Sequence, residues 1–262
     1  MTATPAGLQI DVAHGVAWVR LDRPERMNAM DTALQHLLVE VFCQLDVDDA
    51  VRVIVLGTTS ARAFSVGVDL KEDHTPVDGR RPIVDPMRHA YRNVFETVLE
   101  SHKPTIAALQ GWVVGAGLEL AMACDMRIAA TSAAFRMPES RVGMGANFGS
   151  QMLPRLVSRA HAFDIMYRAE TFDAARAADI GFVSQVCSAT ELDAVVDRIA
   201  TTIATRAPLT LRRFKAMVTH GAALPIPAAL RIDPGTSPYT SDDRLEGAAA
   251  FTEGRDPQWS GR

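Results

Sequence analysis

The feature that most restricts the fold is a nearly continuous apolar stretch over residues 105–124, TIAALQGWVVGAGLELAMAC. It is about as long as a helix that spans a bilayer, which takes roughly 20 residues. However, it contains Gln110, Glu119 and three glycines, and Pro104 directly precedes it. Glycine and proline interrupt regular structure, so a buried strand, a turn and a buried helix beginning near Ala116 explain the stretch better. The sequence therefore predicts no membrane span.

Short apolar strands and amphipathic helices alternate around this stretch, which is typical of an α/β fold. Residues 8–12 and 16–21 predict a hairpin, and residues 51–57 predict a strand buried on both faces. Asp31 is expected to cap a helix whose apolar residues recur at helical spacing. Further elements are expected as follows: a loop at 63–72, a polar segment at 73–86, a helix at 87–101, strands at 126–131 and 133–139, and helices at 143–157 and 241–253.

Four prolines in residues 221–240 predict a linker near the end of the chain. We therefore expect a core domain over residues 1–220, followed by a Pro-rich linker and a C-terminal helical segment over residues 221–262. The last helix carries the apolar run 248–251, which a small surface cannot bury unless another element or subunit covers it.

Composition excludes several classes of protein. The net charge of −4 and the pI near 6.0 do not favour a nucleic-acid partner, which would require a basic surface. Three widely spaced cysteines and the absence of a basic, apolar leader predict a reduced, cytoplasmic protein. The seven histidines show no metal-ligand spacing, so no metal site is predicted.

Glu119 is the most unusual residue, because every neighbour between Ala116 and Cys124 is apolar or glycine. A buried carboxylate either pairs with a cation or shifts its pKa toward neutrality. The first alternative is a structural salt bridge with an arginine, and the second is a general acid or base. Both remain open from this motif alone.

The residues before Glu119 favour the catalytic alternative. Gly115 and Ala116 follow a strand and open a helix, where free N–H groups and the helix dipole stabilise negative charge. Gly67 permits a sharp turn that exposes the N–H of Val68. Glu139 follows another strand and supplies a second carboxylate. Two backbone donors and two carboxylates predict proton transfer beside the carbonyl of a thioester or a similar group.

The chain resembles the crotonase superfamily, the enoyl-CoA hydratase/isomerase family, over essentially its full length. The resemblance lies in the following segments: LDRPERMNAMD (21–31), VIVLGTTSARAFSVGVDLKE (53–72), KPTIAALQGWVVGAGLELAMACDMRIA (103–129), FRMPESRVGMG (135–145) and LEGAAAFTEGRDPQWSGR (245–262). It implies a crotonase-like spiral of repeated ββα units with a helical C-terminal trimerisation region. It also implies a homotrimer, or a hexamer that is a dimer of trimers.

The resemblance also assigns roles to individual residues. Val68 and Ala116 match the two oxyanion-hole N–H positions, and Glu119 and Glu139 match the two glutamates of the hydratases. The expected substrate-binding residues are Arg26, Ala63, Val66, Asp69, Leu70, Lys71, Gly115 and Phe148. No cofactor is expected, because coenzyme A is part of the acyl-CoA thioester substrate.

These positions favour the reversible hydration of a 2-enoyl-CoA. The alternatives are an enoyl-CoA isomerase, a carnitinyl-CoA-type dehydratase and a non-catalytic acyl-CoA-binding protein. Val66, Val68 and Phe148 are bulkier than the residues common in the family. If they line the acyl pocket, compact acyl groups should be preferred, and if they pack into the core, the pocket is unchanged.

Overall fold

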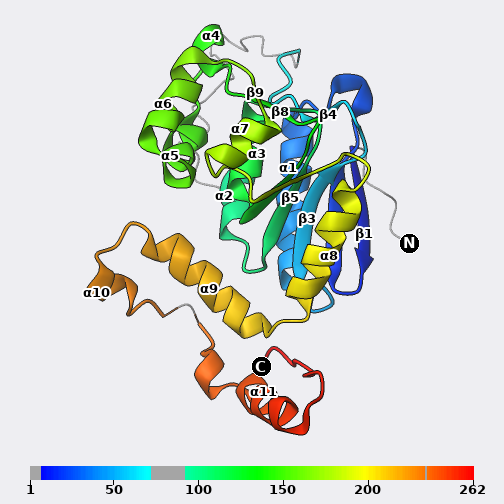
Figure 1. Ribbon diagram of the computed structural model, residues 1–262, viewed down its shortest axis with the longest axis vertical. Helices are drawn as coiled ribbons and strands as arrows, with labels where there is room; N and C mark the ends of the chain where they lie inside the picture. The colour runs from blue at the N-terminus through cyan, green and yellow to red at the C-terminus, as the bar shows by residue number, and fades with distance from the viewer. Residues whose placement is uncertain (1–6, 72–91, 234) are drawn as a thin grey trace, which may run out of the picture.

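The computed structural model describes residues 7–71, 92–233 and 235–262, which form two sheets, helices around them and a helical C-terminal part (Figure 1). The first sheet has six strands in the order β1-β2-β3-β5-β7-β10. β1 and β2 form the antiparallel hairpin predicted from the sequence, and the remaining neighbours are parallel. The strands are β1 Leu8–Ala13, β2 Val16–Leu21, β3 Val53–Thr58, β5 Thr105–Leu109, β7 Met126–Ala130 and β10 Gln185–Cys187.

The second sheet is smaller and has the order β4-β6-β8-β9. Its strands β4, β6 and β8 are parallel neighbours, and β9 joins β8 in the antiparallel sense. The strands are β4 Ala63–Ser65, β6 Trp112–Val114, β8 Ala134–Arg136 and β9 Phe172–Asp173.

The chain builds both sheets at once by repeating one unit. Each unit places a strand in the first sheet, then a strand in the second sheet, and then a helix. The units are β3-β4-α2, β5-β6-α3 and β7-β8-α4, with α2 at Val94–Glu100, α3 at Ala116–Ala123 and α4 at Glu139–Val142. This arrangement confirms the predicted α/β class and the repeated ββα units.

Four short strands were not predicted. β4 lies in the segment expected to be a loop, β6 lies where a turn into the helix was expected, and β9 and β10 lie where no strand was expected. None has more than three residues, which is too short for a strand periodicity to be recognised. The helix expected at 87–101 begins at Val94 after its N-cap Asn93, and residues 73–86 and 87–91 lie outside the described residues.

The remaining helices cover the sheets. Helix α1, Thr32–Val47, begins at the predicted cap, because the Asp31 side chain accepts a hydrogen bond from the Leu34 N–H. Its buried face packs against one face of the first sheet and against α2. Helix α8 covers the opposite face of the first sheet. The other helices of the body are α5 Asn147–Leu156, α6 Arg159–Arg168, α7 Ala174–Asp179 and α8 Leu192–Ala204, with the 3₁₀ turn η1 at Pro24–Arg26.

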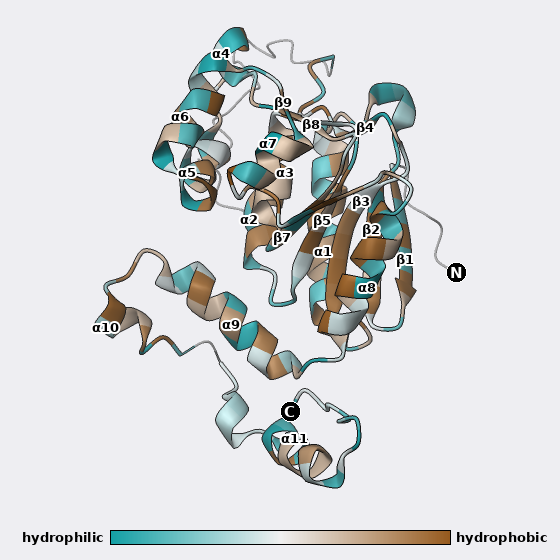
Figure 2. Cartoon of the chain, viewed as in Figure 1, coloured by the Kyte–Doolittle hydropathy of each residue, from teal (hydrophilic) through white to brown (hydrophobic). Residues whose placement is uncertain are grey.

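Hydropathy follows this arrangement. The strands of the first sheet are mostly strongly apolar, while several surrounding helices alternate between polar and apolar faces (Figure 2). All residues of β3 and β5 are buried, as expected for parallel strands covered on both faces. Among the described residues, no helix is both long and apolar enough to cross a membrane.

The C-terminal part extends away from the body (Figure 1). It comprises α9 Pro208–Gly221, α10 Ile226–Ala229, the 3₁₀ turn η3 Pro238–Thr240 and α11 Asp242–Glu253. The last of these is the predicted terminal helix. The proposed boundary at residue 221 falls at the end of α9, and the division into two domains stays a prediction.

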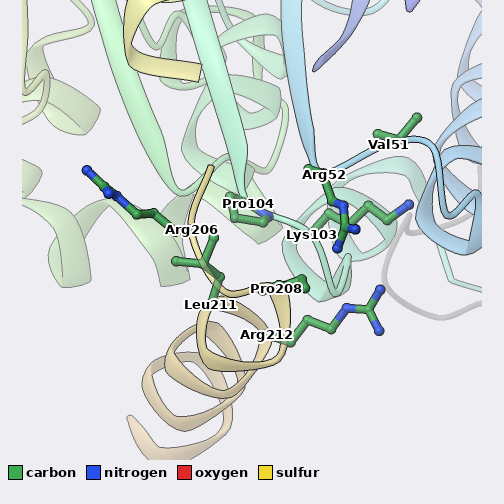
Figure 3. A pocket seen from close by; sticks show the side chains of 8 residues that line it. All are labelled: Val51, Arg52, Lys103, Pro104, Arg206, Pro208, Leu211 and Arg212. Carbon is green, nitrogen blue, oxygen red and sulfur yellow. The ribbon is translucent and has the colours of Figure 1, made fainter. Parts of the chain in front are cut away.

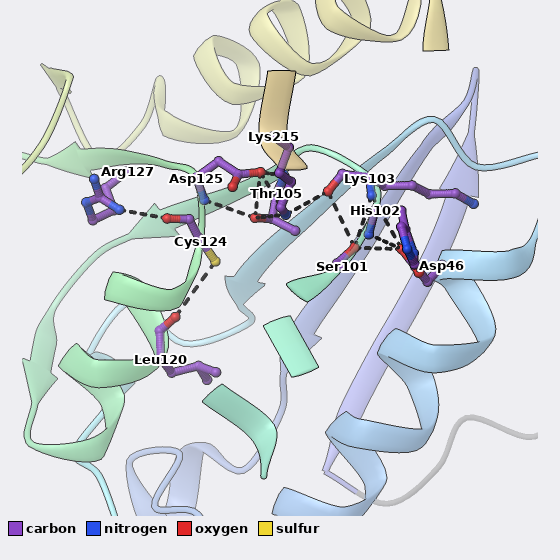
Figure 4. A network of polar contacts seen from close by, with 10 residues as sticks. All are labelled: Asp46, Ser101, His102, Lys103, Thr105, Leu120, Cys124, Asp125, Arg127 and Lys215. Carbon is purple, nitrogen blue, oxygen red and sulfur yellow. Dashed lines mark hydrogen bonds and ion pairs between the residues drawn. The ribbon is translucent and has the colours of Figure 1, made fainter. Parts of the chain in front are cut away.

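A polar network fastens α9 to the body (Figure 4). Lys215 of α9 lies 3.0 Å from the Asp125 carboxylate and donates to the Lys103 carbonyl. The same Asp125 oxygen accepts hydrogen bonds from the N–H and the hydroxyl of Thr105. The Lys215 side chain is only 8% exposed, so this ion pair is largely shielded from water.

We expect Lys215→Met to weaken this attachment, because it leaves a partly buried carboxylate without its cation. The free energy of unfolding should fall by about 2 kcal/mol, less than the ~3–5 kcal/mol of a fully buried pair. Denaturant unfolding measures the change. Arg92→Met is the control, because Arg92 is 64% exposed and its ion pairs should contribute less than about 1 kcal/mol. Equal losses in the two variants would contradict the prediction.

Candidate active site

The predicted site residues follow three neighbouring parallel strands. Val68 comes after β4, Ala116 after β6, and Glu139 after β8. Because the carboxyl ends of parallel neighbours meet at one edge of a sheet, the repeated units bring these residues together. The edge of the second sheet is therefore the candidate site.

The N–H of Val68 is left free by the way its loop is held. Val68 pairs with Met30 in an isolated parallel bridge. Met30 donates to the Gly67 carbonyl at 2.7 Å and accepts from the Asp69 N–H at 3.0 Å. Both bonds use backbone groups that flank Val68, so its own N–H points to the other side of the loop. No described residue accepts a hydrogen bond from it.

The second donor is the N–H of Ala116, the first residue of α3. The amides of Leu118 and Glu119 both bond to the Gly115 carbonyl, whereas no described residue accepts from Ala116. A methyl group on Gly67 would lie only 3.1 Å from the Ala116 nitrogen. The two predicted donors therefore lie beside each other, and both are available to one oxygen atom.

Glycine is required at two positions of this junction. Gly115 has φ 55° and ψ −126°, a conformation that side chains rarely adopt. A methyl group on Gly117 would lie 2.5 Å from the Ser65 carbonyl oxygen, which is a severe overlap. Glycine at residue 117 thus lets α3 approach β4 closely enough to bring the two donors together.

Glu119 lies on the first turn of α3 and is 7% exposed. Its carboxylate accepts a hydrogen bond of 2.6 Å from the Gly149 N–H of α5, and no described cation forms an ion pair with it. Burial is the largest cause that raises its pKa, the Gly149 N–H opposes this rise and the nearby Glu139 charge adds to it, so that the pKa is raised to about 7. The structural salt-bridge alternative thus finds no cation among the described residues, and the raised pKa suits the carboxyl group to exchange a proton near neutral pH.

Glu139 is the first residue of α4 and turns back over the α3 junction. A methyl group on Gly115 would lie 3.1 Å from its Oε1. Its Oε2 is buried and has no hydrogen-bond partner among the described residues. Burial raises the pKa of this carboxyl, although its own backbone N–H partly opposes the effect. A buried oxygen of this kind is suited to hold or receive a proton.

Among the expected substrate-binding residues, Asp69 is buried, whereas its neighbours Leu70 and Lys71 are exposed. Asp69 is 5% exposed, accepts from the Lys71 N–H, and lies 3.8 Å from Arg26 and 4.0 Å from Arg23. Leu70 and Lys71 are exposed beside it. Asp69 is therefore placed to hold the loop, while Arg26, Leu70 and Lys71 are available to a ligand.

The other predicted substrate-binding residues are more buried. Ala63 is fully buried, and its carbonyl already accepts hydrogen bonds from Asn28 and Thr58, so a direct ligand contact at Ala63 is not supported. Val66 is half-buried in the loop. Phe148 is 7% exposed and stacks on Phe95 of α2 with ring centroids 5.3 Å apart. This placement favours the core-packing alternative for Phe148, and its role in substrate binding stays a prediction.

The sequence analysis missed the contribution of Gly149. A methyl group at this position would lie 2.7 Å from Met137 and 3.0 Å from the Glu119 carboxylate. Only a residue without a side chain can bring its N–H so close to Glu119. A glycine two positions after an asparagine near a helix start was visible in the sequence, but nothing there identified its partner.

A hollow lined by basic side chains lies elsewhere, where α9 meets the body (Figure 3). Its lining includes Arg52, Lys103, Arg206 and Arg212 and contains neither glutamate of the candidate site. Lys103 donates to the carbonyls of Leu45 and Asp48 at the end of α1. This hollow is therefore separate from the candidate active site. Among the described residues, no group of three acidic, histidine or cysteine side chains is arranged to hold a metal ion.

The chain is similar to known proteins over nearly its full length. (E)-benzylidenesuccinyl-CoA hydratase of Thauera aromatica is 33% identical, covering 96% of this chain and 98% of the relative. Carnitinyl-CoA dehydratase of Proteus mirabilis is 32% identical, and the match covers 97% of this chain and 98% of the relative. The crystal structure of an enoyl-CoA hydratase from Bacillus anthracis superposes with a TM-score of 0.87 at 28% identity, covering 98% of this chain and 100% of that chain.

The sequence model of the family described as enoyl-CoA hydratase/isomerase matches residues 11–262. That range contains both donor loops, both glutamates and the C-terminal helices. The chain therefore belongs to the enoyl-CoA hydratase/isomerase family.

Proposed function

We propose that this protein catalyses the reversible addition of water across the 2,3 double bond of a 2-enoyl-CoA. The observation that carries the proposal is the placement of two free backbone donors beside two carboxyl groups with raised pKa values. The donors suit an oxygen that gains negative charge, and the carboxyl groups suit proton exchange on either side of the reacting carbons.

The thioester carbonyl oxygen would lie between the N–H groups of Val68 and Ala116. Addition of water to C3 moves electron density through C2 to this oxygen, which becomes enolate-like. The donors then bind the oxygen more strongly than in the ground state, which lowers the barrier. Ala116 also contributes the positive end of the α3 dipole at this point.

The two glutamates would divide the proton transfers. Glu119 acts mainly on the water: as a carboxylate it accepts a proton from the water while the oxygen bonds to C3. Glu139 exchanges the proton at C2, giving it up in hydration and recovering it in dehydration. With the pKa of Glu119 near 7 and that of Glu139 also raised, one proton can be held between the pair at neutral pH.

A dehydratase acting on a hydroxyacyl-CoA is the second candidate. It is favoured by the full-length similarity to carnitinyl-CoA dehydratase. The same donors and glutamates serve in the reverse direction, because elimination of water passes through the same enolate-like state. Isomerisation of the double bond would likewise use the donors, with a proton moved between two carbon atoms in place of water addition.

The proposal also covers the cofactor requirement, the binding of coenzyme A and the location of the protein. Hydration needs neither a metal nor a redox cofactor, because the thioester supplies the electron sink and coenzyme A is part of the substrate. Arg26 and Lys71 offer positive charge to the phosphates of the coenzyme. A cytoplasmic location is supported by the three cysteines Cys43, Cys124 and Cys187, all of which are free.

We further propose that the chain assembles as a homotrimer or as a dimer of trimers. The C-terminal helices expose several large apolar side chains in the single chain: Phe214 62%, Ile226 71%, Leu230 67%, Leu245 72% and Phe251 90% exposed. Apolar side chains gathered on one part of a molecule favour burial against another subunit.

The function is tested first with crotonyl-CoA, whose enoyl absorbance falls when water adds. Glu119→Gln and Glu139→Gln should each lower kcat at least about 10²-fold, because each removes a proton-transferring group. The affinity for acyl-CoA should stay near that of the wild type. Glu40→Gln, on the exposed face of α1, is the matched control and should keep full activity.

The double variant should be little worse than the worse single variant, since the two groups act as a unit. Wild-type turnover in either single variant on the true substrate would rule out its assigned role. If the wild type leaves crotonyl-CoA unchanged but forms an enoyl product from a hydroxyacyl-CoA, the dehydratase candidate replaces the hydratase.

The raised pKa of Glu119 also predicts how stability depends on pH. Below pH about 4.5 the Glu119 carboxyl is protonated in both the folded and the unfolded state, so it does not lower the free energy of unfolding. Between about 4.5 and about 7 only the unfolded chain releases the proton, so stability falls as the pH rises. Above about 7 the full cost of the buried charge is present.

Glu119→Gln removes this cost and should therefore be more stable than the wild type at pH 8. A pKa change from 4.5 to about 7 corresponds to about 3 kcal/mol at most. The advantage should shrink steadily toward pH 4.5. Denaturant unfolding of both proteins across this pH range measures it, and a constant difference would show that the pKa of Glu119 is not raised.

The assembly is tested by light scattering at micromolar concentration, where a trimer or a hexamer is expected. Phe251→Glu should shift the mass toward the monomer, because it places a charge on the most exposed apolar side chain of α11. Val47→Glu, on the exposed end of α1 in the body, is the control and should leave the mass unchanged. A stable wild-type monomer would exclude the proposed assembly.

A further inference from the structure

A fully buried polar residue outside the proposed chemistry lies under the first donor loop. Asn28 is 0% exposed, between η1 and the cap of α1. Its φ is 54°, in the left-handed region that asparagine tolerates better than most residues. Burying an amide is favourable only when its donors and acceptors are satisfied, so its contacts indicate what it does.

The side-chain amide of Asn28 fastens two strand ends. Its Nδ2 donates to Thr58 Oγ1 at 2.8 Å and to the carbonyls of Ala63 and Phe64 at 3.0 Å each. Its Oδ1 accepts from the Arg23 N–H at 2.7 Å. The amide therefore ties the last residue of β3 and two residues of β4 to the turn before α1.

The backbone around Asn28 continues this attachment into the donor loop. Its carbonyl accepts from the Ser65 hydroxyl at 2.7 Å, and that hydroxyl accepts from the Gly67 N–H at 3.1 Å. Met27 accepts from the Val66 N–H, and Met30 pairs across Val68. Residues 27, 28 and 30 thus form hydrogen bonds with the loop at residues 65, 66, 67 and 69, on both sides of Val68.

Strand pairing alone does not fix β4 firmly. β4 has three residues, and its parallel pairing with β6 shifts register between Ala63 and Ser65. A short strand with irregular pairing leaves its carbonyls available, and the Asn28 amide takes two of them. The amide thus supplies hydrogen bonds that a longer, regular strand would obtain from its neighbours.

We propose that Asn28 is a positioning residue for the Val68 donor, setting where its N–H meets the thioester oxygen in the reaction. This inference rests on the proposed function. Asn28 touches no substrate and acts through Ser65 and the loop. A donor displaced by a fraction of an ångström still allows the thioester to bind, but it stabilises the enolate-like oxygen less.

Two variants test the proposal, one that removes the whole Asn28 side-chain amide and one that removes a single hydroxyl group. Asn28→Gly removes the amide while keeping a residue that adopts the left-handed backbone. Ser65→Ala removes only the hydroxyl that joins the Asn28 carbonyl to the Gly67 N–H, and it decides the question if Asn28→Gly does not fold. The control is Ser101→Ala, which removes a hydrogen bond of 2.8 Å from a 5% exposed serine to Asp46, at the ends of α1 and α2 (Figure 4).

The measurement compares two ligands of equal chain length by calorimetry. Butyryl-CoA has an ordinary thioester oxygen, whereas acetoacetyl-CoA forms an enolate whose negative charge is shared by that oxygen and the oxygen on C3. Asn28→Gly should lower the affinity for acetoacetyl-CoA at least about 10-fold and kcat up to about 10²-fold. In Asn28→Gly the affinity for butyryl-CoA and the KM for the enoyl-CoA substrate should change little. Ser65→Ala should also lower the affinity for acetoacetyl-CoA and kcat, but by smaller factors.

The outcomes separate this inference from the proposed function. A wild type that does not prefer acetoacetyl-CoA over butyryl-CoA would contradict the oxyanion site itself, and the inference with it. A wild type that prefers acetoacetyl-CoA, with folded variants that keep the same preference, would overturn the role of Asn28 alone. An equal loss of preference in Ser101→Ala would show that general destabilisation causes the effect, and it would also overturn the proposal.

Discussion

The close approach of α3 to β4 is the constraint on which the rest of the site depends. Gly117 lies so near the Ser65 carbonyl that even a methyl group would overlap it. This contact brings the start of α3 beside the Val68 loop, and it also buries Glu119 on the same turn. The two donors and the shifted carboxyl group therefore share one cause, which is backbone packing that only glycine allows.

Burial makes the carboxyl groups useful and costly at the same time. Glu119 has one strong partner, the Gly149 N–H, and Glu139 leaves its Oε2 without one. More hydrogen bonds would stabilise both charges and lower both pKa values, but they would also remove the proton affinity that the reaction needs. The pKa of Glu119, raised to about 7, thus leaves neither full ionisation nor full protonation favoured near neutral pH, and the pKa of Glu139 is raised by burial as well.

The sequence predicted the elements whose pattern is local. The hairpin, the Asp31 cap and the start of α3 follow from alternation, capping and glycine placement within a few residues. The resemblance placed the donors and glutamates in one site, which spacing alone could not do. The short strands β4, β6, β9 and β10 were missed because two or three residues carry no period, and the sequence left two alternatives for Phe148 because bulk alone does not show which way a ring points. Gly149 and Asn28 act through partners distant in sequence, which only the folded chain brings together.

Repetition of the ββα unit explains how one fold can support several reactions. The first unit provides the Val68 donor, the second provides Ala116 and Glu119, and the third provides Glu139. Because these residues follow adjacent parallel strands, the small sheet sets the order in which they lie side by side. Helix α5, which carries Gly149 and Phe148, can shift the pKa of Glu119 or the shape of the pocket without moving either donor. A family with this construction can exchange hydration, dehydration and isomerisation by changing the surroundings of the carboxyl groups, while the oxyanion site stays the same.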